Sequence, residues 1–226
     1  MSDDHVQRLA AEGVAAGDPT GWFERLYAAA ANAAVPVPWN REGPRELLVD
    51  WAQAHRPPRR GRRAVVVGCG LGADAEYLAG LGYETVAFDV SPSAVRLARA
   101  RHAGSAVRYS TADLLALPPD WLGAFDLVVE SLTVQSMPRW VRRDATAAVG
   151  TLVAPGGTLL VIAAVLPEGE DPDTGPPWRL TGADLEGFTT GGLVPEVTEV
   201  LTDAEGKLRW RAEYRRPPTS RGAPRG

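Results

Sequence analysis

The chain has 226 residues, of which 45% are hydrophobic, and its formal net charge is −4. This length supports one well-buried domain with a short appendage, and the charge provides no field that would recruit nucleic acid or an anionic membrane. Cys69 is the single cysteine, so no disulfide can form within the chain, and no apolar run approaches the roughly 20 residues of a membrane helix. We therefore expect a cytoplasmic monomer or homodimer that binds neither nucleic acid nor membrane.

The N-terminal region has the pattern of a helical appendage. Residues 1–17 are polar and alanine-rich, with helical potential. Asp18 is followed by proline, a combination that favours a helix start with Asp18 as the N-cap, and apolar side chains then recur every four residues from Trp22. A further helix is expected over residues 44–55. We expect residues 1–58 to form a helical cap.

A short apolar run at residues 64–67 begins the main domain. Its β-branched composition predicts a buried strand. Three glycines follow at alternate positions, Gly68, Gly70 and Gly72, and predict a tight turn into a helix. Glycine suits a turn where the backbone must approach a ligand closely, because a Cβ would occupy the ligand's space. A strand, such a turn and a helix N-terminus make a nucleotide-binding corner of an open α/β sheet.

Strands and helices then alternate along the chain. Further strands are predicted at residues 84–88, 106–110, 125–130 and 158–164, with helical patterns between them. This alternation is typical of βαβ units in a parallel sheet. Residues 166–178 are rich in proline, glycine and acidic side chains, so we expect a surface loop there.

The C-terminal part has a different pattern. Apolar and charged residues alternate over residues 208–215, and this strand follows another at 194–201 across a turn. The two should form an antiparallel hairpin that completes the sheet. We expect the main domain to span residues 59–216 and the proline- and arginine-rich residues 217–226 to be disordered.

Three groups fall at the ends of successive strands, where open α/β sheets bind ligands. The first is the glycine turn. The second is Asp89, whose carboxylate can accept hydrogen bonds from both hydroxyls of a ribose. The third is Ala112-Asp113-Leu114, which offers a carboxylate for an exocyclic amine and a backbone N–H for a ring nitrogen. Together they describe an adenosine pocket, although each alone is also explained by a tight turn or a helix cap.

Two ligand classes fit such a pocket. A dinucleotide site requires Gly-x-Gly-x-x-Gly, whereas the third glycine here comes one residue early, and Ala73 occupies the position where that fingerprint tolerates alanine. The glycine spacing alone therefore favours S-adenosylmethionine only modestly. The Asp113 group and the terminal hairpin favour it more strongly.

The ordered motifs resemble those of class I S-adenosylmethionine-dependent methyltransferases. The segments that carry the resemblance are Val65-Val-Val-Gly-Cys-Gly-Leu-Gly72, Val86-Ala-Phe-Asp89, Ala112-Asp113-Leu114, Phe125-Asp-Leu-Val-Val-Glu130 and Pro155-Gly-Gly-Thr158. The resemblance implies a Rossmann-like α/β fold with a mostly parallel seven-stranded sheet and an antiparallel last strand. It also implies that S-adenosylmethionine is the cofactor, with Gly68 and Gly70 facing the methionine portion, Asp89 the ribose, and Asp113 with Leu114 the adenine. Asp74 would reach the cofactor ammonium or else complement the helix dipole. We expect no metal ligand, and the candidate cofactor-binding residues are Gly68, Cys69, Gly70, Asp74, Asp89, Val90, Ala112, Asp113, Leu114 and Glu130.

A second, shorter resemblance lies in the N-terminal part. Pro38-Trp39-Asn40 is similar to the Pro-Trp-Asp segment of thiopurine methyltransferase-like enzymes, in which N-terminal helices cover the active site. Here asparagine replaces the acidic residue. The resemblance implies that the N-terminal helices of this chain cover the active site.

The candidate catalytic residues are Glu130 and Gln135. Glu130 ends a predicted strand and should border the cofactor methyl group, or else anchor the methionine ammonium or a backbone turn. Gln135 lies on the following loop and would orient an acceptor through its amide, or else cap the next helix. No histidine is well placed as a general base, which slightly favours acceptors such as thiols or neutral amines.

The candidate acceptor-binding residues are Trp22, Trp39, Gln135 and Trp178. The tryptophans would form apolar walls and a lid, although ordinary core packing explains Trp22, at helical spacing, better than it explains the other two.

We therefore expect an enzyme that methylates a small molecule, with a sulfur acceptor first and oxygen or nitrogen acceptors as alternatives. Two other hypotheses remain: a non-catalytic S-adenosylmethionine-binding sensor or partner protein, and a nicotinamide-dependent reductase.

Overall fold

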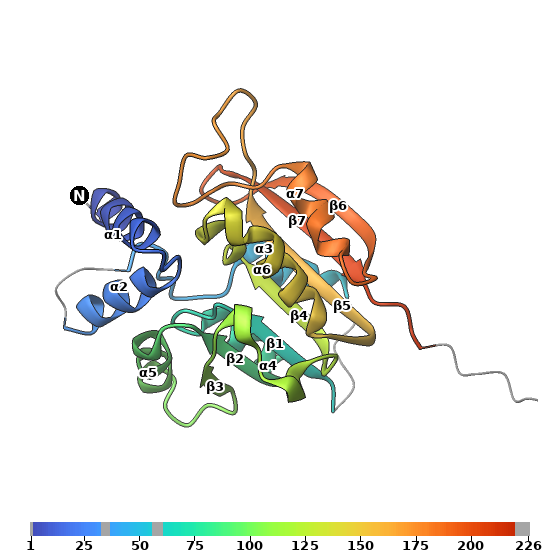
Figure 1. Cartoon of the computed structure of the whole chain (residues 1–226). Helices are drawn as coiled ribbons and strands as arrows, with labels where there is room; N and C mark the ends of the chain where they lie inside the picture. Colours follow the sequence, from blue (N-terminus) through green and yellow to red (C-terminus); the bar gives the residue numbers. More distant parts are fainter. Residues whose placement is uncertain (1, 33–36, 56–60, 220–226) are drawn as a thin grey trace, which may run out of the picture.

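The computed structural model of the protein describes residues 2–32, 37–55 and 61–219. Within these ranges seven strands form one sheet (Figure 1). The strands are β1 (Arg63–Val67), β2 (Glu84–Asp89), β3 (Arg108–Thr111), β4 (Phe125–Ser131), β5 (Val153–Ala164), β6 (Val194–Thr202) and β7 (Leu208–Arg215). Their spatial order is β3-β2-β1-β4-β5-β7-β6, and β7 runs antiparallel to both of its neighbours. The expected fold class is confirmed.

The helices lie on both faces of this sheet and beside it. They are α1 (Ser2–Ala15), α2 (Gly21–Ala31), α3 (Glu46–Ala54), α4 (Ala73–Gly80), α5 (Pro92–Arg101), α6 (Arg139–Thr151) and α7 (Gly182–Glu186), with short 3₁₀ turns η1 (Leu114–Ala116), η2 (Pro119–Trp121), η3 (Val134–Ser136) and η4 (Gly187–Thr189). None of the helices in the described residues has both the length and the apolar character needed to cross a bilayer.

Side chains alternate between the two faces of the strands and fill two cores. Val65, Val67 and Val161 face α6 and α7, where they pack against residues such as Val149. Val66 lies in the opposite core, where it packs with side chains of α3, α4 and α5. A parallel sheet buried on both faces explains why β1 is an unbroken apolar run in the sequence.

Helix α3 belongs with the sheet. Its Leu47, Leu48 and Trp51 lie in the same core as Ala64 and Leu78. Helices α1 and α2 instead form a separate pair to one side of the sheet, with α2 against α5 (Figure 1). Helix α3 therefore packs on the sheet, although it lies within the expected helical cap of residues 1–58.

Helix α2 starts later than the sequence indicates. Asp18 does not serve as its N-cap, because the helix begins at Gly21 and Thr20 occupies the cap position. The Asp18 carboxylate nevertheless accepts a hydrogen bond from the Gly21 N–H at 2.7 Å. It thus satisfies one of the free amides at the helix N-terminus from a position two residues further out.

One carboxylate joins the N-terminal pair to the sheet domain. Glu24 of α2 accepts hydrogen bonds from Ser91 Oγ at 2.6 Å, from Ser93 Oγ at 2.6 Å and from the Ser93 N–H at 3.0 Å. Burial alone would raise the pKa of Glu24, but these hydrogen bonds lower it overall. Because Ser91 is the N-cap of α5, Glu24 places a negative charge at the positive end of that helix.

The predicted C-terminal hairpin agrees with the structure, where β6 and β7 pair antiparallel. Before them, Thr181 and Asp184 form a reciprocal capping box at the start of α7. The predicted disordered tail at 217–226 falls mostly outside the described residues.

Candidate cofactor and acceptor site

A cavity of about 750 Å³ lies at the carboxyl ends of the central strands and extends beneath the N-terminal helices. Most of the candidate residues line it: Trp22, Trp39, Gly68, Cys69, Gly70, Asp74, Asp89, Val90, Ala112, Asp113, Leu114 and Gln135. Two candidates, Glu130 and Trp178, are not among the lining residues.

The glycine turn forms the floor of this cavity. Gly68 and Gly70 have φ angles of +59° and +51°, a left-handed conformation that favours glycine. A Cβ on Gly68 would lie 2.4 Å from the Thr133 hydroxyl, and one on Gly70 would lie 2.9 Å from the Tyr27 hydroxyl. The glycines thus allow protein side chains, and not only a ligand, to approach the turn closely.

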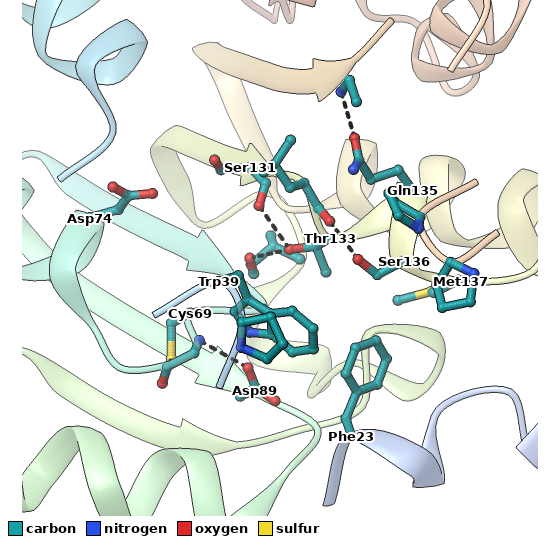
Figure 2. Close-up of a pocket in the computed structure, with 18 of the residues that line it drawn as sticks. Phe23, Trp39, Cys69, Asp74, Asp89, Ser131, Thr133, Gln135, Ser136 and Met137 are labelled. Atoms are coloured by element: carbon teal, nitrogen blue, oxygen red, sulfur yellow. Dashed lines mark hydrogen bonds between the residues drawn. The ribbon is translucent and has the colours of Figure 1, made fainter. Parts of the chain in front are cut away.

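Asp89 is fixed beside this turn. Its Oδ2 accepts from the Gly70 N–H at 3.0 Å (Figure 2), and its Oδ1 accepts from the Ser91 N–H, also at 3.0 Å. Only 6% of the residue is exposed. Burial raises the pKa of Asp89 to about 6, and the charge of Glu24 adds to the rise while the backbone hydrogen bonds oppose it. Each oxygen retains acceptor capacity, so the carboxylate can still receive hydroxyl donors from the cavity.

Asp113 lies farther along the same edge of the sheet. It is exposed, and its Oδ1 accepts from the Leu115 N–H at 2.9 Å, so it caps η1. Asp113 and Leu114 both line the cavity. Asp113 therefore caps a helical turn, which was the alternative explanation from the sequence, and it also lines the cavity.

Opposite charges meet beside the first turn of α4. The Asp74 carboxylate accepts from the Arg45 N–H at 2.8 Å, and burial raises the pKa of Asp74. Arg45 lines the cavity, and no ion pair or hydrogen bond of its guanidinium is found within the described residues. The sequence contains no signal for Arg45, because its place in the cavity depends on how α3 packs against the sheet.

The loop after β4 supplies further lining residues that sequence reasoning missed. Leu132 has a φ of +61°, the one positive value found for a non-glycine residue in the described chain, and such strain is often found at functional sites. Ser131 also lines the cavity, and its buried hydroxyl has no hydrogen-bond partner in the described part of the chain. Neither feature has a sequence pattern that would reveal it.

Glu130 lies outside the cavity. Its side chain is fully buried, and its Oε1 accepts from the backbone N–H groups of Thr133 and Val134 at 2.7 and 2.9 Å. Burial raises the pKa of Glu130 to about 7, although these two hydrogen bonds oppose the rise. The carboxyl group holds the β4–η3 turn, so the structure does not bring it to the position expected for a catalytic or cofactor-binding residue.

Gln135 lines the cavity, whereas Trp178 does not line it and contacts Gln135 through its backbone. The Gln135 Oε1 accepts from the Ala164 N–H at 2.6 Å (Figure 2). Trp178 is buried, and its backbone N–H donates to the Gln135 carbonyl at 2.7 Å. Trp178 therefore helps to position the residue that lines the cavity, and it does not form a wall itself.

The aromatic wall comes from the N-terminal region. The Trp39 indole N–H donates to the Tyr27 hydroxyl at 2.7 Å, and the Trp39 and Phe23 ring centroids lie 6.3 Å apart. Both rings line the cavity. Trp22 is 1% exposed and stacks on Phe23, so core packing accounts for most of its surface.

The cavity has no metal centre in the residues the structure describes. No group of three histidine, cysteine, aspartate or glutamate side chains there is arranged to hold a metal ion. No histidine is among the described lining residues either. Burial raises the pKa of the Cys69 thiol, which disfavours a nucleophilic thiolate.

Comparison with known proteins agrees with this geometry. Residues 64–157 match the family model described as a methyltransferase domain. A ubiquinone biosynthesis O-methyltransferase from Xanthomonas axonopodis pv. citri is 31% identical over 135 residues, which cover 54% of each protein. The chain thus spans about half the length of the curated relatives it matches.

Solved structures show the same fold over a longer stretch. The structure described as "Conversion of a Disulfide Bond into a Thioacetal Group during Echinomycin Biosynthesis" has a TM-score of 0.70 at 22% identity and covers 88% of this chain and 93% of its own. The [4+2]-cyclase SpnF has a TM-score of 0.69 at 18% identity, and the match covers 88% of this chain and 97% of the cyclase chain. The family match over residues 64–157 and the strand order make this part of the chain similar to a methyltransferase domain.

Proposed function

We propose that the whole protein transfers a methyl group from S-adenosylmethionine to a small-molecule acceptor. The observation that carries this proposal is a single cavity that joins the glycine turn and Asp89 to an aromatic wall. The cofactor supplies an activated methyl group. The chain's own residues would then have to hold the acceptor in line with that group and exclude water.

The geometry supports a role for each part of the donor half. Gly68 and Gly70 would border the methionine portion, Asp89 would accept from the ribose hydroxyls, and Asp113 with Leu114 would bind the adenine. Arg45 and Asp74 carry opposite charges beside the turn, so they suit the carboxylate and the ammonium of the methionine portion. The Ser131 hydroxyl, which is buried and unpaired within the described residues, would gain a partner there.

The acceptor atom is the finer part of the proposal. The curated relatives are named as O-methyltransferases, which favours oxygen. The described lining residues include no imidazole that would deprotonate a weakly acidic hydroxyl, which favours a thiol or a neutral amine. We propose a thiol as the first acceptor class to test and a phenol as the second.

The N-terminal helices would cover the acceptor. The similarity of Pro38-Trp39-Asn40 to thiopurine methyltransferase-like enzymes is supported by the place of Trp39 in the cavity wall, whereas the curated relatives bear another name. We therefore include thiopurines in the acceptor screen without assigning the subgroup. We also propose that α1 and α2 form the cap, that α3 belongs to the main domain, which ends near residue 216, and that the protein works in the cytoplasm.

Calorimetry with S-adenosylhomocysteine and with NADH tests the cofactor. We expect S-adenosylhomocysteine to bind and NADH to give no signal; the opposite pattern would support a nicotinamide-dependent reductase and overturn the proposal. A screen of thiols, thiopurines, phenols and amines for release of S-adenosylhomocysteine then tests transfer. If the cofactor binds tightly but every acceptor class is inactive, a non-catalytic binding protein becomes the better explanation.

A further inference from the structure

Gln135 lines the cavity with a side-chain NH₂ group that has no partner within the described residues. The residue is 4% exposed and lines the cavity from η3. Its side-chain oxygen and its backbone carbonyl are both occupied, by the N–H groups of Ala164 and Trp178. No partner for its Nε2 is found among the residues that the structure describes.

The orientation of this amide is fixed by its partner. A backbone N–H can only donate, so the atom of Gln135 that lies 2.6 Å from the Ala164 nitrogen must be the oxygen. The NH₂ group then points away from β5. Figure 2 shows Gln135 beside the open space that Trp39, Phe23 and Met137 also border.

This donor lies in a different part of the site from the glycine turn, Asp89 and Asp113. The glycine turn, Asp89 and Asp113 follow β1, β2 and β3. Gln135 follows β4 and is bonded to the end of β5, on the other side of β1 in the strand order. The amide is therefore placed to meet the acceptor instead of the adenosine.

The surroundings of the donor define the shape of its ligand. Phe23 and Trp39 present aromatic rings, and Met137 adds an apolar surface. At one edge of the cavity the Gln7 side chain of α1 donates to the Pro176 carbonyl at 3.3 Å. Aromatic and thioether side chains pack well against a planar ring, whereas they offer no hydrogen bonds to a flexible polar chain.

We propose that Gln135 Nε2 is the specificity-determining donor for the acceptor, which is a planar ring compound with a carbonyl, phenolate or ring-nitrogen atom that accepts a hydrogen bond. This inference rests on the proposed function, because it assumes that the acceptor enters the same cavity as the cofactor. A ring without such an atom would leave the buried amide unpaired and lose affinity.

Gln135→Glu is the most informative variant. A glutamate keeps an oxygen to accept the Ala164 N–H and has nearly the same shape, but it has no NH₂ group to donate. Gln53→Glu is the matched control, because it makes the same chemical change at an exposed position of α3 away from the cavity. Gln135→Leu removes the donor without adding charge.

The probes are coumarin, which has a lactone carbonyl, and naphthalene, which has a similar planar shape and no hydrogen-bonding atom. Ligand-observed NMR titrations of the full chain, saturated with S-adenosylhomocysteine, give the affinity ratio, which is the affinity for coumarin divided by the affinity for naphthalene. We expect this ratio to fall about tenfold or more in Gln135→Glu, where two acceptors would face each other, and about 2- to 10-fold in Gln135→Leu, from the usual range for one hydrogen bond. The ratio should not change in Gln53→Glu.

A second measurement uses the unmodified protein, so it holds even if the variants fail to fold. The side-chain amide resonances of Gln135 should shift when coumarin is added and stay in place with naphthalene. An unchanged affinity ratio in Gln135→Glu, an unmoved Gln135 resonance, or no binding of either probe would each overturn the inference. Failure of the wild-type protein to bind S-adenosylhomocysteine would overturn the proposed function instead.

Discussion

Protonation of Asp89 should control the affinity of the cofactor site. The pKa of this carboxyl lies at about 6 in the free protein, mainly because of burial. Ribose hydroxyls would donate to the ionised form, so binding requires the carboxylate and is lost as the pH falls through about 6. About one molecule in ten is ionised at pH 5, so S-adenosylhomocysteine should bind about tenfold more weakly there than at pH 8.

Calorimetric titrations between pH 5 and pH 8 measure this dependence. Asp89→Asn keeps the size of the side chain but removes the titration, so its affinity should be lower throughout, by about 1–3 kcal/mol at pH 8, and nearly independent of pH. The reasoning is refuted if the wild-type affinity varies by less than about twofold over this range, or if Asp89→Asn keeps the same pH dependence. Glu130 titrates nearby with a pKa of about 7, so the measurement is repeated with Glu130→Gln.

Three further predictions concern the parts that shape the site. Glu24→Ala removes the acceptor of three hydrogen bonds and should destabilise the protein by about 1–3 kcal/mol in urea denaturation. The control Glu12→Ala, at an exposed position, should change stability by less than about 0.5 kcal/mol. Equal effects of the two substitutions would mean that the Glu24 hydrogen bonds contribute nothing. Gly68→Ala should destabilise the protein by about 1–3 kcal/mol, because the φ of Gly68 is +59° and a Cβ there would meet Thr133. The control Gly80→Ala places its Cβ in open space and should be neutral or stabilising by up to about 1 kcal/mol. A tolerated Gly68→Ala would contradict the turn geometry. Glu130→Gln keeps an oxygen that can accept from the Thr133 and Val134 amides. The affinity for S-adenosylhomocysteine and the rate of any transfer reaction should therefore stay within about threefold of the wild-type values. A large fall in rate would restore Glu130 as a catalytic candidate.

The elements that could be predicted from the sequence are those that depend on local patterns. The apolar run before Gly68 and the alternation over residues 208–215 each follow from the period of a strand, and the structure contains both strands. Asp89 and Asp113 could be found because they directly follow strands whose carboxyl ends meet at one edge of the sheet.

The elements that could not be predicted depend on which way a side chain turns and on contacts distant in sequence. Glu130 ends its strand as expected, but its carboxyl group turns to the backbone amides of its own loop. Trp178 lies in a proline-rich loop, yet it is buried, and its indole N–H donates to the Asp173 carbonyl of the same loop. Nothing in the sequence around Arg45 or Glu24 marks them; the packing of α3 brings Arg45 to the cavity, and the packing of α2 brings Glu24 to the N-terminus of α5.

The strand order separates the site into two halves that can vary independently. The glycine turn, Asp89 and Asp113 follow β1, β2 and β3, whereas the walls around Gln135 come from the N-terminal region, from Met137 after η3 and from the segment after β5. Replacements at Phe23, Met137 or Pro176 would reshape the acceptor chamber without touching the ribose anchor. A protein built in this way can acquire a new acceptor through changes in its covering segments while it keeps the same methyl donor, and those segments are therefore the natural targets for redesign.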